Sequence, residues 1–179
     1  MKNCIIIHWT GSNSESFWHP WLKYELEKIW YNVWLPDIPN AELPELSEWL
    51  PFILKNWHFN SETVLVWHSA WVPTILSVLE NIDVMIKKSI LIAGFIEPLN
   101  NEPNPILQNE YNWAKIKESC SEFIIINSDN DPWGCDDKKG KKIADNLDWT
   151  FIIKHDWHMW SISFNQPYKE FPELLKYIN

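Results

Sequence analysis

The chain has 179 residues, of which 46% are hydrophobic and 22% charged; this ordinary globular composition excludes disordered and collagen-like chains. Its net charge is -9, from 15 Lys and Arg against 24 Asp and Glu. Such an acidic surface repels phosphate backbones and anionic lipids, so we expect neither a nucleic-acid-binding nor a membrane-binding protein.

Short apolar runs alternate along the chain with segments of helical periodicity. The first run, Asn3–His8, is apolar without alternation, which is typical of a strand buried on both faces. The pattern predicts further strands at 32–35, 62–66, 88–93, 123–127 and 150–154. It predicts helices at 17–29, 46–54, 70–79, 113–118 and 136–146, and a last one carrying Phe171, Leu174, Leu175 and Ile178.

This alternation of buried strands and helices predicts an α/β fold. We expect a three-layer sandwich in which a mostly parallel, six-stranded sheet lies between two layers of helices. No repeat or linker interrupts the pattern, so we expect a single domain over residues 1–179. In such sheets, function gathers at the carboxyl ends of the strands.

The cysteines and the N-terminus bear on location. Cys4, Cys120 and Cys135 are odd in number and form no Cys-x-x-Cys motif, so neither a disulfide framework nor a zinc site is indicated. The apolar run after Lys2 is too short for a signal peptide or a membrane span. We therefore expect a cytoplasmic protein with reduced thiols.

Three predicted strands end in residues that suit nucleophilic catalysis. Ser69 follows the third strand at a tight turn into a helix, where the turn lifts a serine hydroxyl clear of the backbone. Asp129 and Asp131 follow the fifth strand, and His158 follows the sixth. The order Ser, Asp, His along the chain is the order that α/β-hydrolases use.

An enzyme of this kind also needs backbone N–H groups to hold an oxyanion. The N–H of Ala70, directly after the serine, is the first donor that we expect. The first strand ends at His8, so Trp9 or Thr10 would supply a second donor at the same edge of the sheet.

Each of these residues also has a purely structural interpretation. Ser69 could cap the following helix, and Asp131 could form a turn. We expect His68, beside the serine, to pack rather than to act in catalysis. His155 and His158 are spaced like metal ligands, but at a strand end they point to opposite faces and a third ligand is not evident. We therefore expect no metal and no cofactor.

Short motifs along the full chain extend this interpretation: His8-x-Thr10-Gly11, Phe17-Trp18-x-x-Trp21, Leu35-Pro36-Asp37, Trp49-Leu50-Pro51-Phe52, His68-Ser69-Ala70, Trp113-x-x-Ile116, Asp129-Asn130-Asp131-Pro132 and His158. With them, the chain resembles the small serine hydrolases of the retinoblastoma-binding-protein-nine type, which have a compact α/β-hydrolase-like fold. The resemblance implies that Ser69 is the nucleophile, His158 the general base and Asp131 the residue that orients the base. Asp129 is the second candidate for the acid.

The chain departs from that family at its motif glycines. The family pattern around the nucleophile is Gly-x-Ser-x-Gly, and Trp67 and Trp71 stand at its two glycine positions. Tryptophan also stands at six further positions where the family, a turn or a helix end favours glycine: Trp9, Trp30, Trp57, Trp149, Trp157 and Trp160. An indole at the nucleophile turn overpacks a gap between strand and helix backbones, at a cost of about 1–3 kcal/mol per site.

The composition suggests a reason for this departure. The chain holds 14 Trp but only 4 Gly, and glycine at all eight positions would restore the usual content of about 7%. We hypothesise that the source organism reads UGA codons as glycine, whereas the sequence was written with UGA as tryptophan.

The sequence thus predicts a serine hydrolase that cleaves an ester or amide of a small substrate through an acyl-enzyme. If Trp67 and Trp71 are genuine, the alternative is a catalytically inactive binding protein on the same fold. A nucleotide-binding domain is disfavoured, because the chain has no glycine-rich phosphate loop. The polar, proline-rich segment Glu97–Glu110 is expected to overhang the site and shape the acyl pocket. The sequence indicates neither the substrate nor a protein partner.

Overall fold

Six parallel strands form the centre of the molecule. The computed structural model describes residues 1–8, 10–99, 103–159 and 168–178. The strands lie in the order β2-β1-β3-β4-β5-β6, and each neighbouring pair is parallel. Their bounds are β1 (Asn3–Ile7), β2 (Asn32–Trp34), β3 (Thr63–His68), β4 (Lys88–Ile92), β5 (Phe123–Ser128) and β6 (Thr150–Lys154). The predicted α/β class with six strands is confirmed.

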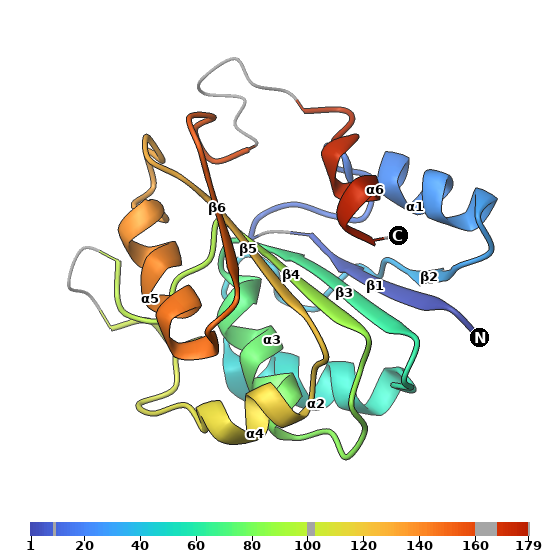
Figure 1. Ribbon diagram of the computed structural model, residues 1–179, viewed down its shortest axis with the longest axis horizontal. Helices are drawn as coiled ribbons and strands as arrows, with labels where there is room; N and C mark the ends of the chain where they lie inside the picture. Colours follow the sequence, from blue (N-terminus) through green and yellow to red (C-terminus); the bar gives the residue numbers. More distant parts are fainter. Residues whose placement is uncertain (9, 100–102, 160–167, 179) are drawn as a thin grey trace.

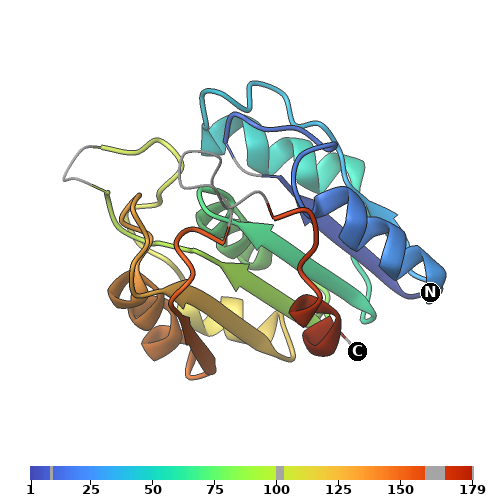
Figure 2. The same ribbon diagram turned by 90° about the horizontal axis from the view of Figure 1, so that it is seen from above.

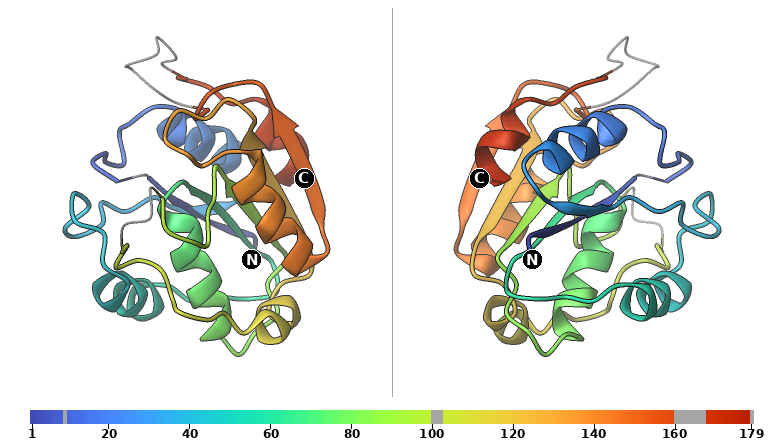
Figure 3. Two further views of the ribbon diagram at one scale, coloured as in Figure 1. Left: turned by 90° about the vertical axis from the view of Figure 1, so that its left-hand side faces the viewer. Right: turned by 90° about the vertical axis from the view of Figure 1, so that its right-hand side faces the viewer.

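Helices cover both faces of this sheet. They are α1 (His19–Lys28), α2 (Leu46–Asn56), α3 (Trp71–Glu80), α4 (Trp113–Glu118), α5 (Asp137–Leu147) and α6 (Glu173–Ile178). Helices α1 and α6 lie together on one face, and α2, α3, α4 and α5 lie on the other (Figures 1 and 3). The result is the three-layer arrangement that the alternation predicts.

Burial follows from the position of each strand in the sheet. Every residue of β1, β3, β4 and β5 is buried, because each of these strands has a neighbour on both sides and helices on both faces. The run of isoleucines in β1 and β5 suits this environment, since each fully buried side chain contributes about 1.5–3 kcal/mol. The edge strand β6 pairs only with β5, and its residues are exposed or half-buried.

Two predicted boundaries differ from the structure. Strand β3 continues two residues past its predicted end at Val66, because Trp67 and His68 keep pairing with β4. Helix α1 begins at His19 instead of Phe17, because Phe17 has a φ of 56°, which lies outside the right-handed helical region.

Different parts of the molecule lie at the carboxyl and amino ends of the parallel strands. The loops that follow β1, β3, β5 and β6 gather at the carboxyl edge, where the predicted catalytic residues lie. The N-terminus and the end of α6 lie toward the opposite edge (Figure 2). There the Lys88 ammonium at the start of β4 donates to the backbone oxygen of Tyr177 in α6. In the part of the chain that the structure describes, no helix is both long and apolar enough to cross a membrane.

Candidate active site

The turn between β3 and α3 presents Ser69. Its φ is 59°, in the left-handed region that non-glycine residues rarely adopt, so the backbone at this residue is strained. Two hydrogen bonds hold that conformation: the Ser69 N–H donates to the Ile92 oxygen at 2.8 Å, and the Val72 N–H donates to the Ser69 oxygen at 3.0 Å. A serine strained between a strand and a helix is the local geometry of a nucleophile elbow.

Three side chains from three strand ends form one hydrogen-bonded chain. His158 Nδ1 lies 2.6 Å from Asp131 Oδ2, and His158 Nε2 lies 3.0 Å from Ser69 Oγ. Because a carboxylate only accepts, Nδ1 carries the ring proton, and Nε2 is left to accept from the serine hydroxyl. The Asp131 and His158 side chains are 0% and 2% exposed, so bulk water hardly competes with these bonds. This is the arrangement of a nucleophile, a general base and an orienting acid.

The structure separates the two candidate acids. Asp131 Oδ1 accepts from the Trp133 N–H at 2.8 Å, which leaves Oδ2 directed at His158. Asp129 instead lies at the surface, where it pairs with His155 Nδ1 at 2.7 Å. The structure therefore brings Asp131 to the serine and histidine and keeps Asp129 and His155 away from them.

Two asparagines to which the sequence analysis gave no role hold the loops of this site. Asn127, fully buried in β5, donates to the backbone oxygens of Gly94 and Cys135 at 3.0 and 2.9 Å, which ties the Asp131 loop to the end of β4. Asn130 Oδ1 accepts from the Trp157 N–H at 2.8 Å, next to His158. For Asn127 the sequence did hold a signal: it is an amide at the end of an otherwise apolar strand, and a buried polar group needs hydrogen-bond partners.

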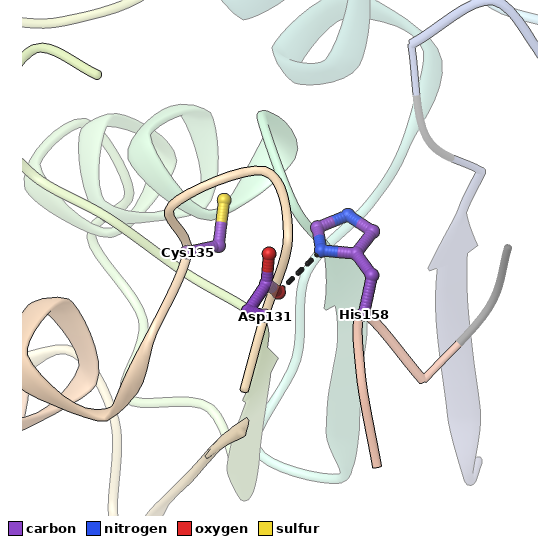
Figure 4. A group of neighbouring side chains, drawn as sticks. All are labelled: Asp131, Cys135 and His158. Carbon is purple, nitrogen blue, oxygen red and sulfur yellow. Dashed lines mark hydrogen bonds and ion pairs between the residues drawn. The ribbon is translucent and has the colours of Figure 1, made fainter. Parts of the chain in front are cut away.

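Cys135 borders the hydrogen-bonded chain. Figure 4 shows its sulfur beside the Asp131 carboxylate, and the ligand atoms of Cys135, Asp131 and His158 all lie within 4.8 Å of one another. Burial, with the Asp131 charge as a second cause, raises the pKa of the Cys135 thiol well above its ordinary value. These donors could suit a thiophilic cation, but Asp131 and His158 already bond to each other directly, which favours proton transfer.

Of the three residues expected to supply oxyanion donors, the structure describes Ala70 and Thr10. Ala70 is the N-cap of α3, and its N–H follows that of Ser69, which is already bonded to Ile92. Thr10 lies after β1, and its side-chain oxygen is buried with no hydrogen-bond partner among the described residues. Trp9 lies outside the described residues, so its part in the site stays a prediction.

The segment predicted to shape an acyl pocket packs near the Asp131 loop. A cavity of about 390 Å³ is lined by this segment itself and the residue before it, from Ile96 to Asn109. Glu97 pairs with Lys139 and Lys142 of α5, which fastens the segment to the helix after the Asp131 loop. Residues 100–102 lie outside the described residues, so the predicted overhang is not tested there.

Comparison with known proteins agrees with this geometry. The family described as Serine hydrolase matches residues 4–178. The Bacillus subtilis (strain 168) protein YdeN is 30% identical over 135 residues, which cover 73% of this chain and 71% of YdeN. Serine hydrolase RBBP9 of Rattus norvegicus is 26% identical over 138 residues, again covering 73% and 71%. The crystal structure of the B. subtilis ydeN product has a TM-score of 0.90 at 26% identity, covering 99% and 98% of the two chains.

Proposed function

Because this chain belongs to the serine hydrolase family, we propose that it cleaves an ester or amide of a small substrate with Ser69, His158 and Asp131. The observation that carries the proposal is the unbroken chain of hydrogen bonds from the Asp131 carboxylate through the imidazole to the serine hydroxyl. The family establishes a hydrolase, and this geometry supports acyl transfer as its reaction.

In the proposed reaction, His158 Nε2 takes the Ser69 proton as Oγ bonds to the substrate carbonyl carbon. The tetrahedral intermediate then collapses: its bond to the leaving oxygen or nitrogen breaks, and His158 returns the proton to the leaving group. The acyl group stays on Ser69 until a water, deprotonated by His158, attacks and releases the acid. Asp131 keeps the Nδ1 proton in place and stabilises the imidazolium in both halves of the reaction.

The oxyanion of each tetrahedral intermediate would be held by backbone N–H groups. Ala70 supplies one from the N-terminus of α3, where the aligned peptide dipoles of a ten-residue helix favour negative charge. Trp9 or Thr10 would supply the second. This chemistry uses only groups of the chain, so we propose a reaction without metal or cofactor.

We also propose that the protein acts in the cytoplasm. Cys4, Cys120 and Cys135 are all free and buried, which suits a reducing compartment.

The test is labelling by a fluorophosphonate, which reacts with an activated serine. We expect one label per chain, lost in Ser69→Ala, and a loss on the order of 10⁶ in kcat for the same variant if the three residues act as a unit. The matched control is Ser128→Ala, because Ser128 is buried at the end of β5 and should leave labelling intact. Labelling of folded Ser69→Ala at the native rate would refute the assignment.

The tryptophans at motif positions lead to a second part of the proposal: in its native cell the chain carries glycine there. Trp30 has a φ of 71° and Trp157 a φ of 49°, a region that favours glycine and costs a bulky residue about 1–2 kcal/mol. Phe17 and Met159 share this region, so the two angles support the proposal only together with the packing of the other tryptophans.

Packing around the nucleophile turn supplies that support. Trp67 and Trp71 are fully buried, and their indole N–H groups have no partner among the described residues. The Trp71 ring centroid lies 3.1 Å from that of Trp49 at 11°, closer than the about 3.5 Å at which carbon atoms make favourable contact. A glycine at 71 removes the crowding.

At two other suspected positions, Trp57 and Trp149, the backbone conformation does not favour glycine. Trp57 has extended backbone, with a φ of -133°, and stacks on Trp34 at 5.3 Å, and Trp149 is not among the residues with positive φ. Trp9 and Trp160 lie outside the described residues. The proposal is therefore strongest for Trp30, Trp67, Trp71 and Trp157.

The decisive measurement is the intact mass of the chain from its native source. A mass below 21.4 kDa by one Gly-for-Trp difference per recoded position supports glycine, and UGA codons at 67 and 71 would agree. A mass of 21.4 kDa makes the tryptophans genuine. The crowded turn then favours the second candidate function, a catalytically inactive binding protein, which predicts a folded chain that no fluorophosphonate labels.

A further inference from the structure

A second histidine lies beside the catalytic one. His68, the last residue of β3, is fully buried, and its ring centroid lies 4.7 Å from that of His158 and 6.1 Å from that of Trp18. Alternation along β3 sends Trp67 toward α3, whose first residue Trp71 it contacts edge-on, and His68 toward the opposite face. His68 therefore lies under His158, on the face that α1 covers.

His68 reaches the backbone of His158. Its Nε2 lies 2.9 Å from the His158 carbonyl oxygen, and because a carbonyl only accepts, Nε2 must carry the proton. Its Nδ1 is buried with no partner among the described residues. Burial, followed by the nearby rings of His158 and His19, lowers the pKa of His68 well below its ordinary value. His68 is therefore neutral, with a fixed donor.

This bond completes the anchoring of the catalytic histidine. The His158 ring is held by Asp131 and Ser69, but its backbone belongs to the loop after the edge strand β6. The Trp157 N–H, one residue earlier, donates to Asn130 Oδ1, and the His158 carbonyl oxygen accepts a hydrogen bond from His68 Nε2. His68 at the end of β3 and Asn130 in the loop after β5 thus each hold one side of this loop.

We propose that His68 is a positioning residue: its neutral imidazole holds the backbone of His158 so that Nε2 stays in line with Ser69 Oγ. This rests on the proposed function of Ser69 and His158. During the reaction, the His158 ring becomes an imidazolium and must present Nε2 first to Ser69 and then to the leaving group. A fixed backbone limits the ring to that small motion, and a displacement of about 1 Å costs up to about 100-fold in rate.

The test compares His68→Gln with His68→Leu. The glutamine amide can donate from nearly the position of Nε2, whereas leucine fills similar space without a donor. Saturation kinetics of fluorophosphonate labelling separate the maximal rate from the half-saturating concentration. We expect His68→Leu to lower the maximal rate about 10- to 100-fold with half-saturation unchanged, and His68→Gln to stay within about threefold of the native rate.

The control is His19→Asn, at another buried histidine position. The His19 ring bonds to the Ser16 backbone oxygen and not to the loop of His158, so this variant should leave the maximal rate unchanged. Thermal unfolding of each variant verifies that it is folded, and His68→Met replaces His68→Leu if the latter unfolds. Native labelling of a folded apolar variant would overturn the proposal. Equal slowing in His68→Gln and His68→Leu would also overturn it, because a donor would then not matter.

A second readout is independent of activity. Hydrogen exchange of the His158 Nδ1–H, followed by NMR, should be faster in His68→Leu than in His68→Gln, because the looser backbone weakens the bond to Asp131. If the native chain is not labelled through Ser69, the proposed function fails, and this comparison alone decides on His68. Equal exchange in the two variants would then refute the positioning role.

Discussion

Acidification should destabilise this fold through His19. His19 begins α1 and is buried; its Nδ1 donates to the Ser16 oxygen at 2.7 Å, and its Nε2 has no partner among the described residues. Burial is the main cause that lowers its pKa to about 3, with a smaller contribution from His8 and partial opposition from the Ser16 bond. Between pH 6.5 and 3 the unfolded chain therefore binds a proton that the folded chain does not, so stability falls as pH falls.

The size of this effect follows from the pKa difference. Each pH unit below 6.5 costs about 1.4 kcal/mol, so His19 lowers the free energy of unfolding by about 2 kcal/mol at pH 5. The perturbation is His19→Asn, which keeps a donor toward Ser16 and cannot titrate. Urea unfolding of both proteins at pH 7.5 and pH 5 gives the difference between their free energies of unfolding at each pH. The pKa of His68 stays lowered in both proteins, because burial is its main cause and the contribution of His19 is minor. A difference that changes by less than about 0.5 kcal/mol would refute this reasoning.

Three further predictions concern the acid, a cap and a strained turn. Asp131→Asn should lower kcat on the order of 10⁴-fold, as loss of the orienting carboxylate does in a serine protease. Asp129→Asn, the control, should leave ester hydrolysis nearly unchanged. Equal losses in the two variants would contradict the choice of Asp131 as the acid. Asp136→Ala removes the side chain that accepts from the Lys139 N–H at the start of α5, and should lower unfolding free energy by about 1 kcal/mol in urea titration. Trp30→Gly should raise the melting temperature, because Trp30 has a φ of 71° and the residue is 87% exposed. Glycine therefore relieves about 1 kcal/mol of strain and loses little burial, and a lower melting temperature would contradict this.

The sequence was sufficient for the fold because its signals were repeated along the whole chain. Uninterrupted apolar runs such as that of β1 identify strands buried on both faces, and helical spacing between them identifies the covering layers. The position of Ser69 after β3 also followed from this pattern, since the carboxyl edge of a parallel sheet is where such residues gather.

The motif resemblance favoured Asp131 over Asp129 as the acid, but the contacts that separate the two residues, and those of the supporting residues, lie in no local pattern. Asp129 and Asp131 differ by only two positions, and only the path of the loop directs one to His158 and the other to His155. Asn127 and His68 look like ordinary core residues in sequence, because their partners, Gly94 and His158, are 33 and 90 residues away. Such pairs appear only once the sheet is assembled.

The position of β6 at the edge of the sheet has a consequence for how activity is lost. The loop that carries His158 follows a strand that has a single neighbour, while Ser69 follows a strand in the middle of the sheet. Edge elements with few buried contacts open at lower free energy than the whole molecule does. Mild denaturant should therefore release His158 before the core melts. If His158 is the base that activates Ser69, as proposed, a covalent serine probe would report on the opening of this one strand.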